Sequence, residues 1–162
     1  MKTVQILLQR ISCMVVLISG TASLFAQKDQ TIPIKDIIGS RHYIFKAQTV
    51  SPTGGRTRQL NTGYTLKVFN DTIIADLPYF GRAYAPPSNL AGGGISFTSL
   101  KHDYTVLQDK KKRWQITIKP SDANDVENLS LTVFEDGTAD LTVNSRDRQP
   151  ISFRGYISGN SH

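Results

Sequence analysis

The chain has 162 residues and a formal net charge of +6, and hydrophobic residues make up 39% of the sequence. A chain of this length is expected to fold as one domain and to bury most of an apolar core without cross-links. Its single cysteine, Cys13, excludes an internal disulfide framework. The positive residues are dispersed apart from the run DKKKR at 109–113, which argues against a nucleic-acid partner.

The first 26 residues are predicted to be a secretory signal peptide. Lys2 and Arg10 precede an apolar run from Ile11 to Ile18, and small residues follow up to Ala26. The uncharged run is shorter than the roughly 20 residues that a membrane-spanning helix needs. We expect cleavage near Ala26, export to the periplasm or outside the cell, and no transmembrane span in the mature chain.

Export also limits which cysteine chemistry and which binding partners are expected for the mature chain. Cys13 lies in the segment to be removed and follows little apolar sequence, so lipidation of Cys13 is the weaker reading. The mature chain would then have no thiol, disulfide or cysteine metal site. Because exported proteins rarely meet nucleic acid, we expect only weak, salt-dependent attraction to anionic envelope surfaces.

Residues 27–40 are predicted to form an N-terminal segment with a short helix. In the stretch TIPIKDIIGS, Pro33 suits a first helical turn, three isoleucines share one face, and Gly39 can end the helix.

From residue 41 to residue 162 the sequence predicts a β-domain made of one strand after another. Residues that favour strands alternate with polar ones, which is typical of antiparallel sheets with one packed face. Tight hairpin turns are expected at Asn70–Asp71 and at Asp136–Gly137. The nine segments are HYIFKAQ, GYTLKVF, TIIADL, GISFTSL, DYTVLQ, RWQITIK, NLSLTVFE, TADLTVNS and ISFRGYI.

These strands predict an all-β fold. Short meandering strands must hide their edges, either by closing into a barrel or by stacking as a sandwich. The near-consecutive hairpins favour a single antiparallel up-and-down barrel of roughly eight strands, with a β-sandwich as the alternative. Such a barrel holds side chains or one small ligand. Inward-pointing Tyr64, Phe97, Trp114 and Phe153 would leave no cavity.

The sequence contains no recognisable catalytic constellation. It has no G-x-S-x-G elbow, no H-E-x-x-H pair and no P-loop. His102 has Asp103 beside it, but adjacent strand residues face opposite ways. Asp122, Asp125 and Glu127 lack the glycine and the later glutamate of an EF-hand loop. We therefore expect no catalytic residue, no metal and no cofactor, and a protein that is not an enzyme.

An aromatic cluster is the first candidate for a binding site. The stretch LPYFGRAYAPP holds Tyr79, Phe80, Arg82 and Tyr84, and its prolines exclude a long central strand. Such a corner could stack on a ligand and bind a carboxylate through Arg82. Alternatively, the aromatic residues plug one mouth of the barrel while Arg82 pairs with an acid.

Two arginine pairs are the second candidate. Arg56 and Arg58 in GGRTRQ, and Arg146 and Arg148 in SRDRQP, are each expected on one side of an extended segment. Together they could form a cationic rim for an anionic group. The alternative is that both pairs are solvated strand faces.

Three stretches of the chain carry a resemblance to a known family. They are FKAQTVSPTGGRTRQLNTGYTLKVFNDTIIADLPYFGRAY, WQITIKPSD and LTVFEDGTADLTVNSRDRQPISFRGYI. They resemble an uncharacterised secreted family of Bacteroidetes, domain of unknown function 4251, from about Tyr43 to Ile157. The resemblance implies a compact, exported, lipocalin-like antiparallel barrel. It implies no reaction and no catalytic residue.

Two functional hypotheses of different classes follow. In the first, a non-enzymatic barrel binds a small apolar or amphipathic ligand, or a peptide, at the mouth near Tyr79. In the second, a filled barrel serves as an envelope structural or interaction module, and its basic surface or exposed edge contacts a protein or an acidic glycan. The sequence leaves the oligomeric state open.

Overall fold

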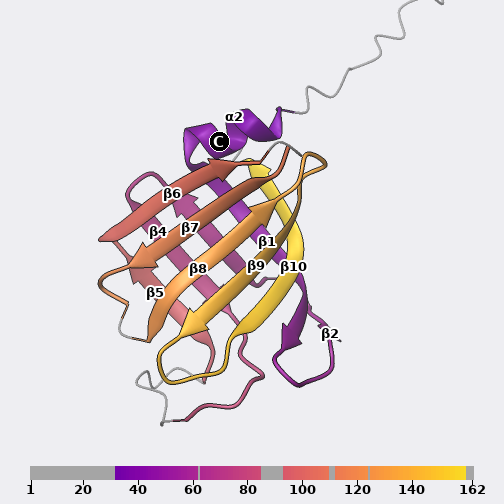
Figure 1. Ribbon diagram of the computed structural model, residues 1–162, viewed down its shortest axis with the longest axis vertical. Coiled ribbons are helices and arrows are strands. Elements are labelled where there is room, and N and C mark those ends of the chain that lie inside the picture. Colours follow the sequence, from indigo (N-terminus) through magenta and orange to yellow (C-terminus); the bar gives the residue numbers. More distant parts are fainter. Residues whose placement is uncertain (1–31, 62, 85–92, 110–111, 124, 160–162) are drawn as a thin grey trace, which may run out of the picture. The chain divides into compact units, whose positions relative to one another are not determined.

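Ten strands of one antiparallel sheet curl into a nearly closed barrel, and a short helix covers one end of it (Figure 1). The computed structural model describes residues 32–61, 63–84, 93–109, 112–123 and 125–159. The predicted signal peptide lies outside the described residues. Within the described ranges, no helix combines the length and the apolar character that crossing a membrane requires.

The strands occupy the segments that the alternation of residues predicts. Nine of them correspond to the nine predicted segments, and the tenth, β2, has only two residues. The prediction of an antiparallel barrel with one short helix is therefore confirmed. The elements are α2 (Ile34–Ser40), β1 (His42–Pro52), β2 (Arg58–Gln59), β3 (Thr65–Phe69), β4 (Thr72–Leu77), β5 (Ile95–Ser99), β6 (His102–Gln108), β7 (Trp114–Pro120), β8 (Val126–Val133), β9 (Thr138–Ser145) and β10 (Ile151–Gly159).

The sheet is ordered β5-β4-β3-β1-β10-β9-β8-β7-β6, with β2 attached to β1. β1 therefore joins the two halves of the chain, since it pairs with β2 and β3 on one side and with β10 on the other. The layer of β6 to β10 crosses over the layer of β1, β3, β4 and β5 (Figure 1). β5 and β6 stand at the two ends of the order, and no ladder joins them within the described residues. We call the gap between β5 and β6 the seam.

Two tight turns lie where the sequence predicts them. Asn70, with a φ of 41°, lies between β3 and β4, and Gly137, with a φ of 84°, lies between β8 and β9. A positive φ is readily adopted by glycine and is tolerated by asparagine. The two predicted hairpins are therefore confirmed.

The helix α2 belongs to the same packing unit as the barrel. It follows Pro33 at its N-cap and ends at Arg41, whose φ of 51° is left-handed, so Gly39 is not the residue that stops it. Ile37 and Ile38 are buried in the barrel core. The compact unit accordingly begins at residue 32.

Large apolar and aromatic side chains pack together in the interior of the barrel. Trp114 and Phe153 are buried, and the half-buried Tyr64 and Phe97 pack against the same cluster. A barrel of about this size has room for its own side chains or for one small ligand, and these large side chains lie in that room. The other large, fully buried side chains are Tyr43, Phe45, Leu66, Ile73, Leu77, Ile116, Ile118, Leu129, Leu131, Leu141 and Ile151.

A pair of tyrosines joins β1 to β6, which are not neighbours in the sheet. The Oη atoms of Tyr43 and Tyr104 lie 3.0 Å apart. Burial raises the pKa of Tyr43 well above its ordinary value and also raises the pKa of Tyr104, so both phenols stay neutral. The Arg41 guanidinium carbon lies 4.6 Å from the centre of the Tyr104 ring. β6 is thus held from the interior as well as by β7.

The short connection between β5 and β6 is fixed by one carboxylate. Asp122 accepts hydrogen bonds from the Ser99 hydroxyl, from the Leu100 N–H at 2.8 Å and from the Lys101 N–H at 3.2 Å. The Ser99 hydroxyl, followed by the Leu100 N–H, holds the pKa of Asp122 below its ordinary value. Asp122 therefore fixes the connection between β5 and β6.

A glycine at the centre of the sheet should not tolerate a methyl group. A Cβ atom on Gly155 would lie 1.9 Å from the Lys46 carbonyl oxygen of β1, whereas a Cβ atom on Gly39 would meet nothing within 4 Å. We expect Gly155→Ala to lower the free energy of unfolding by more than about 2 kcal/mol. Gly39→Ala should raise it by about 0.5–1 kcal/mol, because alanine favours the helix. Urea unfolding of both variants measures the difference, and equal effects would contradict the assigned close approach.

Acid should weaken the hydrogen bonds that Asp122 accepts at the connection between β5 and β6. Because folding lowers the pKa of Asp122, its contribution to stability is present above the ordinary carboxyl pKa and disappears as the pH falls through the lower, folded value. Asp122→Ala should therefore destabilise the protein at neutral pH, and the deficit should shrink below about pH 4. Thermal unfolding across this range measures it, with Asp103→Ala on exposed β6 as the control. A deficit that is the same at every pH would contradict the assignment.

Candidate binding site

The aromatic corner lies at the barrel end opposite α2. It follows Leu77, the last residue of β4, and it pairs with the loop that precedes β10. Ala83 forms a bridge with Arg148, and the Gln149 N–H donates to the Arg82 carbonyl at 3.1 Å. The corner and this loop therefore form one main-chain unit.

Arg148 is the centre of this unit. Only 4% of the residue is exposed, and its Nη1 donates to the carbonyl oxygens of Gly93 at 2.9 Å and Gly94 at 3.1 Å. Its Nη2 lies 2.7 Å from Asp125 Oδ2, close enough for an ion pair although the N–H is not aligned for a hydrogen bond. Arg148 thus ties the start of β5 to the loops before β8 and β10.

Tyr79 is part of the same unit. The Arg148 guanidinium carbon lies 5.2 Å from the centre of its ring, and its hydroxyl is 2.8 Å from the Arg82 carbonyl and 3.0 Å from the Gln149 carbonyl. A Cβ atom on Gly81 would lie 2.5 Å from that hydroxyl, so the ring needs glycine there. Burial raises the pKa of Tyr79 above its ordinary value. Tyr79 therefore holds the corner together.

The other three residues of the predicted aromatic site are exposed at the surface. Phe80 is 43% exposed and Tyr84 is 71% exposed. Arg82 is exposed as well, and its side chain has no ion-pair partner among the described residues. The guanidinium carbon of Arg58 lies 5.1 Å from the centre of the Phe80 ring. The predicted set therefore divides into one structural residue and three surface residues.

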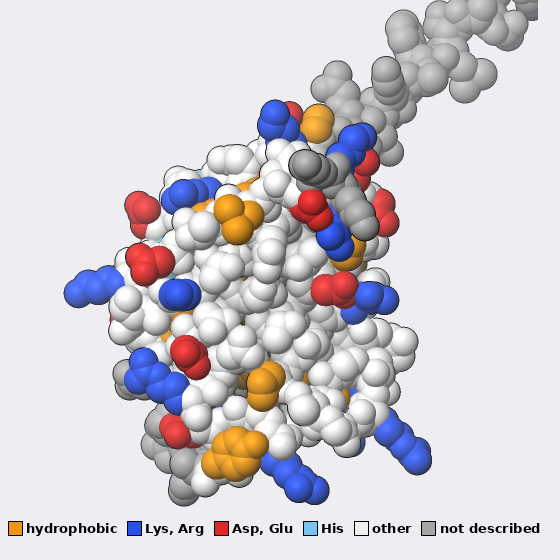
Figure 2. Space-filling view, in the orientation of Figure 1, with side chains coloured by type: hydrophobic (Ala, Val, Ile, Leu, Met, Phe, Trp, Pro, Cys, Tyr) orange, Lys and Arg blue, Asp and Glu red, His pale blue; other side chains and the backbone are white. Residues whose placement is uncertain are grey.

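The four arginines do not form the predicted cationic rim. Arg56, Arg58 and Arg146 are exposed, but Arg148 is buried and paired with Asp125. The expectation that Arg146 and Arg148 share one face was wrong for Arg148, because residues 146–150 lie between two strands and do not alternate as a strand does. On the face formed by β6 to β10, positive and negative side chains are interspersed (Figure 2).

The titratable residues singled out in the sequence serve other purposes. Along β6 the half-buried His102 alternates with the exposed Asp103. Asp122 fixes the β5–β6 connection, and Asp125 pairs with Arg148. Within the described residues, no three histidine or acidic side chains cluster as metal ligands would.

A β-bulge in β1 creates a different kind of site. Ala47 lies opposite Gly155 and Thr49 lies opposite Arg154, so Gln48 is an extra residue with no partner on β10. The bulge shifts the alternation by one position, so that Gln48 is exposed and Thr49 half-buried while Val50 returns to the core. Bulges commonly re-aim side chains beside functional sites.

On its other edge, β1 changes partner at the same point. It pairs with β3 up to Lys46 and with β2 from Thr49 onward. The segment between β2 and β3 is hydrogen-bonded to β1 near both of its ends. The Leu60 N–H donates to the Gln48 carbonyl at 2.8 Å, and the Ala47 N–H donates to the Tyr64 carbonyl at 3.0 Å. This arrangement places the segment's side chains beside those of β1.

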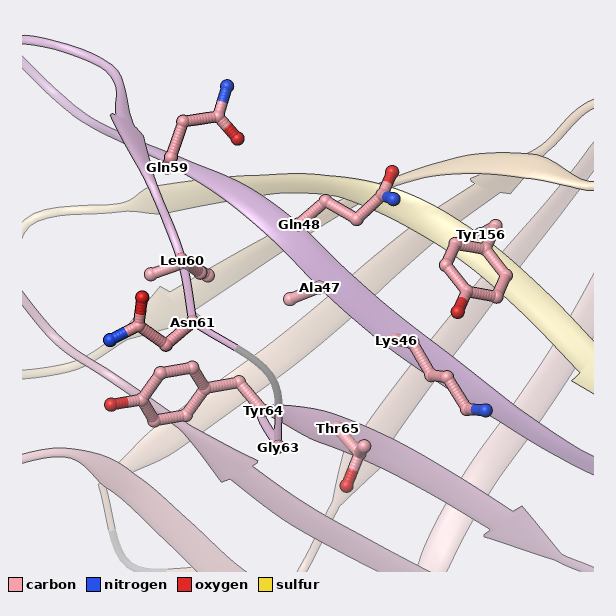
Figure 3. Close-up of a pocket in the computed structure, with 10 residues that line it drawn as sticks. All are labelled: Lys46, Ala47, Gln48, Gln59, Leu60, Asn61, Gly63, Tyr64, Thr65 and Tyr156. Carbon is pink, nitrogen blue, oxygen red and sulfur yellow. The ribbon is translucent and has the colours of Figure 1, made fainter.

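The result is a surface recess of about 450 Å³, which we call the β1 groove (Figure 3). Side chains from β1, from the segment between β2 and β3, and from β10 surround it (Figure 3). Its amides Gln48, Gln59 and Asn61 have no hydrogen-bond partner among the described side chains. Lys46 Nζ lies 5.9 Å from the centre of the Tyr156 ring. The lining residues are Lys46, Ala47, Gln48, Gln59, Leu60, Asn61, Gly63, Tyr64, Thr65 and Tyr156.

A second recess of about 360 Å³ lies beside the β1 groove, and Tyr64 belongs to both. Its wall includes Tyr79 and Phe80 of the aromatic corner, together with Asp76 of β4. The predicted aromatic residues are thus next to a hollow, although its larger neighbour was not predicted. The sequence signal for the β1 groove was the amide-rich stretch QLN at 59–61, which alternation alone marks only as a loop.

The two arginines of SRDRQP should differ sharply in their contribution to stability. Arg148→Met leaves Asp125 and two carbonyl groups without their partner, and loss of one member of a buried ion pair costs about 3–5 kcal/mol. Arg146→Met changes an exposed side chain and should alter the free energy of unfolding by no more than about 0.5 kcal/mol. Chemical denaturation of the two variants compares them directly. Similar free energies of unfolding for the two variants would contradict the central structural role assigned to Arg148.

The family of the chain follows from comparison with known proteins. Residues 26–157 match the family described as Domain of unknown function (DUF4251). A similar fold occurs in the crystal structure of a DUF4251 family protein from Bacteroides eggerthii DSM 20697, with a TM-score of 0.58, 14% sequence identity, and coverage of 77% of this chain and 84% of that chain. No curated protein matches the chain. The chain therefore belongs to the DUF4251 family, as the resemblance of its sequence predicts.

Proposed function

We propose that this protein is an exported, non-enzymatic binding protein that holds a short hydroxyl-rich ligand, a segment of an acidic glycan, in the β1 groove. One observation carries the proposal. Three side-chain amides, a lysine and two tyrosines line a single recess, and the amides have no described partner of their own.

The chemistry of the lining selects the ligand class. Each amide offers two N–H donors and one acceptor oxygen, which suits vicinal hydroxyl groups better than an apolar ligand. A tyrosine ring such as that of Tyr156 offers a flat face for stacking on a sugar ring. Lys46 supplies one positive charge for a carboxylate on the ligand.

The neighbouring recess extends this site. Arg58 stacks on Phe80 beside that second recess, and Tyr64 is the wall that the two recesses share. A ligand longer than one sugar could therefore reach from Lys46 past Tyr64 towards Arg58. Both ends of that path carry a positive side chain, against the single carboxylate of Asp76 in the wall of the second recess, and this balance favours an acidic glycan over a neutral one.

The lining also supports a binding role rather than catalysis. None of the described residues that line the β1 groove is a carboxylate, an imidazole or a thiol. General acid–base and nucleophilic chemistry most often uses such groups, although lysine and tyrosine can also serve. The basic and apolar N-terminal 26 residues support export, where glycans of the cell envelope are the available ligands.

Titration with defined oligosaccharides tests the proposal. We expect oligogalacturonate to bind and the neutral maltohexaose to bind more weakly, as followed by isothermal calorimetry. Gln48→Ala with Asn61→Ala removes at least two hydrogen bonds of about 0.5–1.5 kcal/mol each, so affinity should fall about tenfold or more. Lys46→Gln should weaken the acidic ligand and leave the neutral one nearly unchanged.

Gln115→Ala is the matched control, because Gln115 is an exposed glutamine on β7 outside the β1 groove. It should leave binding unchanged. The proposal fails if neither oligosaccharide binds at millimolar concentration, or if the Gln48 and Asn61 changes have no more effect than the control.

A further inference from the structure

We propose that the free edge of β6 pairs with β6 of a second copy of this chain, which joins two barrels about a twofold axis. This inference is independent of the β1 groove. It rests on the seam, where β6 pairs with β7 on one edge and with no described strand on the other.

The main-chain bonds show which groups of β6 are available. The Ser121 N–H donates to the Lys101 carbonyl and the Asp109 N–H donates to the Arg113 carbonyl, and each bond joins residues that face each other across β6 and β7. In an antiparallel ladder the hydrogen-bonded positions alternate, so the odd-numbered residues between 101 and 109 bond to β7. The N–H and C=O groups of Tyr104 and Val106 therefore point to the free edge.

The length of β6 sets the register of the pair. Full antiparallel overlap of His102–Gln108 with its copy places Thr105 opposite Thr105 of the second copy. Tyr104 then lies opposite Val106 of the second copy, so groups that face the free edge in both chains meet each other. A shift by one residue would place free groups opposite groups already bonded to β7.

The charged residues of β6 and its flanks are compatible with this register. Lys101 comes to lie opposite Asp109 of the second copy, beside the ion pair that Asp109 makes with Arg113 in its own chain. Asp103 lies opposite Leu107 of the second copy, and no two like charges face each other. The next register that keeps the free groups opposite each other is centred on Val106. It would place Asp103 opposite Asp109 of the second copy, and like charges directly opposite are destabilising.

The pairing covers Val106 with Tyr104 of the second copy, which supplies an apolar contact, whereas Leu107 lies opposite Asp103. Leu107 is 63% exposed and Val106 is 38% exposed, and both lie on this edge strand. β6 runs without a bulge, a proline or a lysine, which are the features that natural edge strands use against pairing. A twofold interface of this kind uses the same surface of both chains.

Sedimentation velocity on the purified protein from micromolar to millimolar concentration tests the pairing. We expect a monomer–dimer equilibrium that Thr105→Lys weakens at least tenfold, because the introduced lysines face each other at the twofold axis. Thr98→Lys, on the exposed outer face of β5, should leave the dimer intact. Thr105 is exposed, so thermal unfolding should report a folded monomer in the Thr105→Lys variant.

Amide hydrogen exchange gives a second, position-specific readout. The N–H groups of Tyr104 and Val106 should gain protection as concentration rises, while those of Thr105 and Leu107, bonded to β7, stay protected throughout. The proposal is overturned if the protein stays monomeric at every concentration. A dimer that resists Thr105→Lys, or that Thr98→Lys disrupts, overturns it equally.

Discussion

The close approach of β10 to β1 at Gly155 is the constraint on which this architecture depends. With no Cβ atom there, the Lys46 carbonyl can lie against the strand, and β1 takes up its bulge at Gln48. The bulge lets β1 bend and change partner from β3 to β2 while keeping β10 along its other edge. Barrel closure between the two halves of the chain and the existence of the β1 groove thus have one origin.

The two ends of the barrel are closed by different means. At one end α2 inserts Ile37 and Ile38 into the core. At the other end a buried arginine, Arg148, gathers three loops through an ion pair, two carbonyl groups and an aromatic ring. On the outer surface, the bulge in β1 and the unpaired edge of β6 are the most distinctive features of the described residues.

Alternation of residues was enough to predict nine of the ten strands, because period-two patterns report directly which face of a strand is buried. The turn residues at 70–71 and 136–137 predicted two hairpins, and the near-consecutive hairpins predicted the barrel. Alternation failed at Arg148, because residues in a loop do not alternate between two faces. The burial of Arg148 depends on Asp125 and on the start of β5. Alternation also gave no sign of the bulge in β1, which shifts the alternation from Thr49 onward. Both misses concern long-range contacts that no local pattern encodes.

The most direct test of the account is to map the ligand site on the folded protein. Backbone amide shifts recorded during titration with oligogalacturonate would show which residues contact the ligand. The account predicts changes concentrated at Gln48, Asn61 and Tyr64, with residues 79–84 affected only beside the second recess. Changes confined to the aromatic corner, or shifts spread evenly over the basic surface, would contradict the claim that the bulge in β1 builds the binding site.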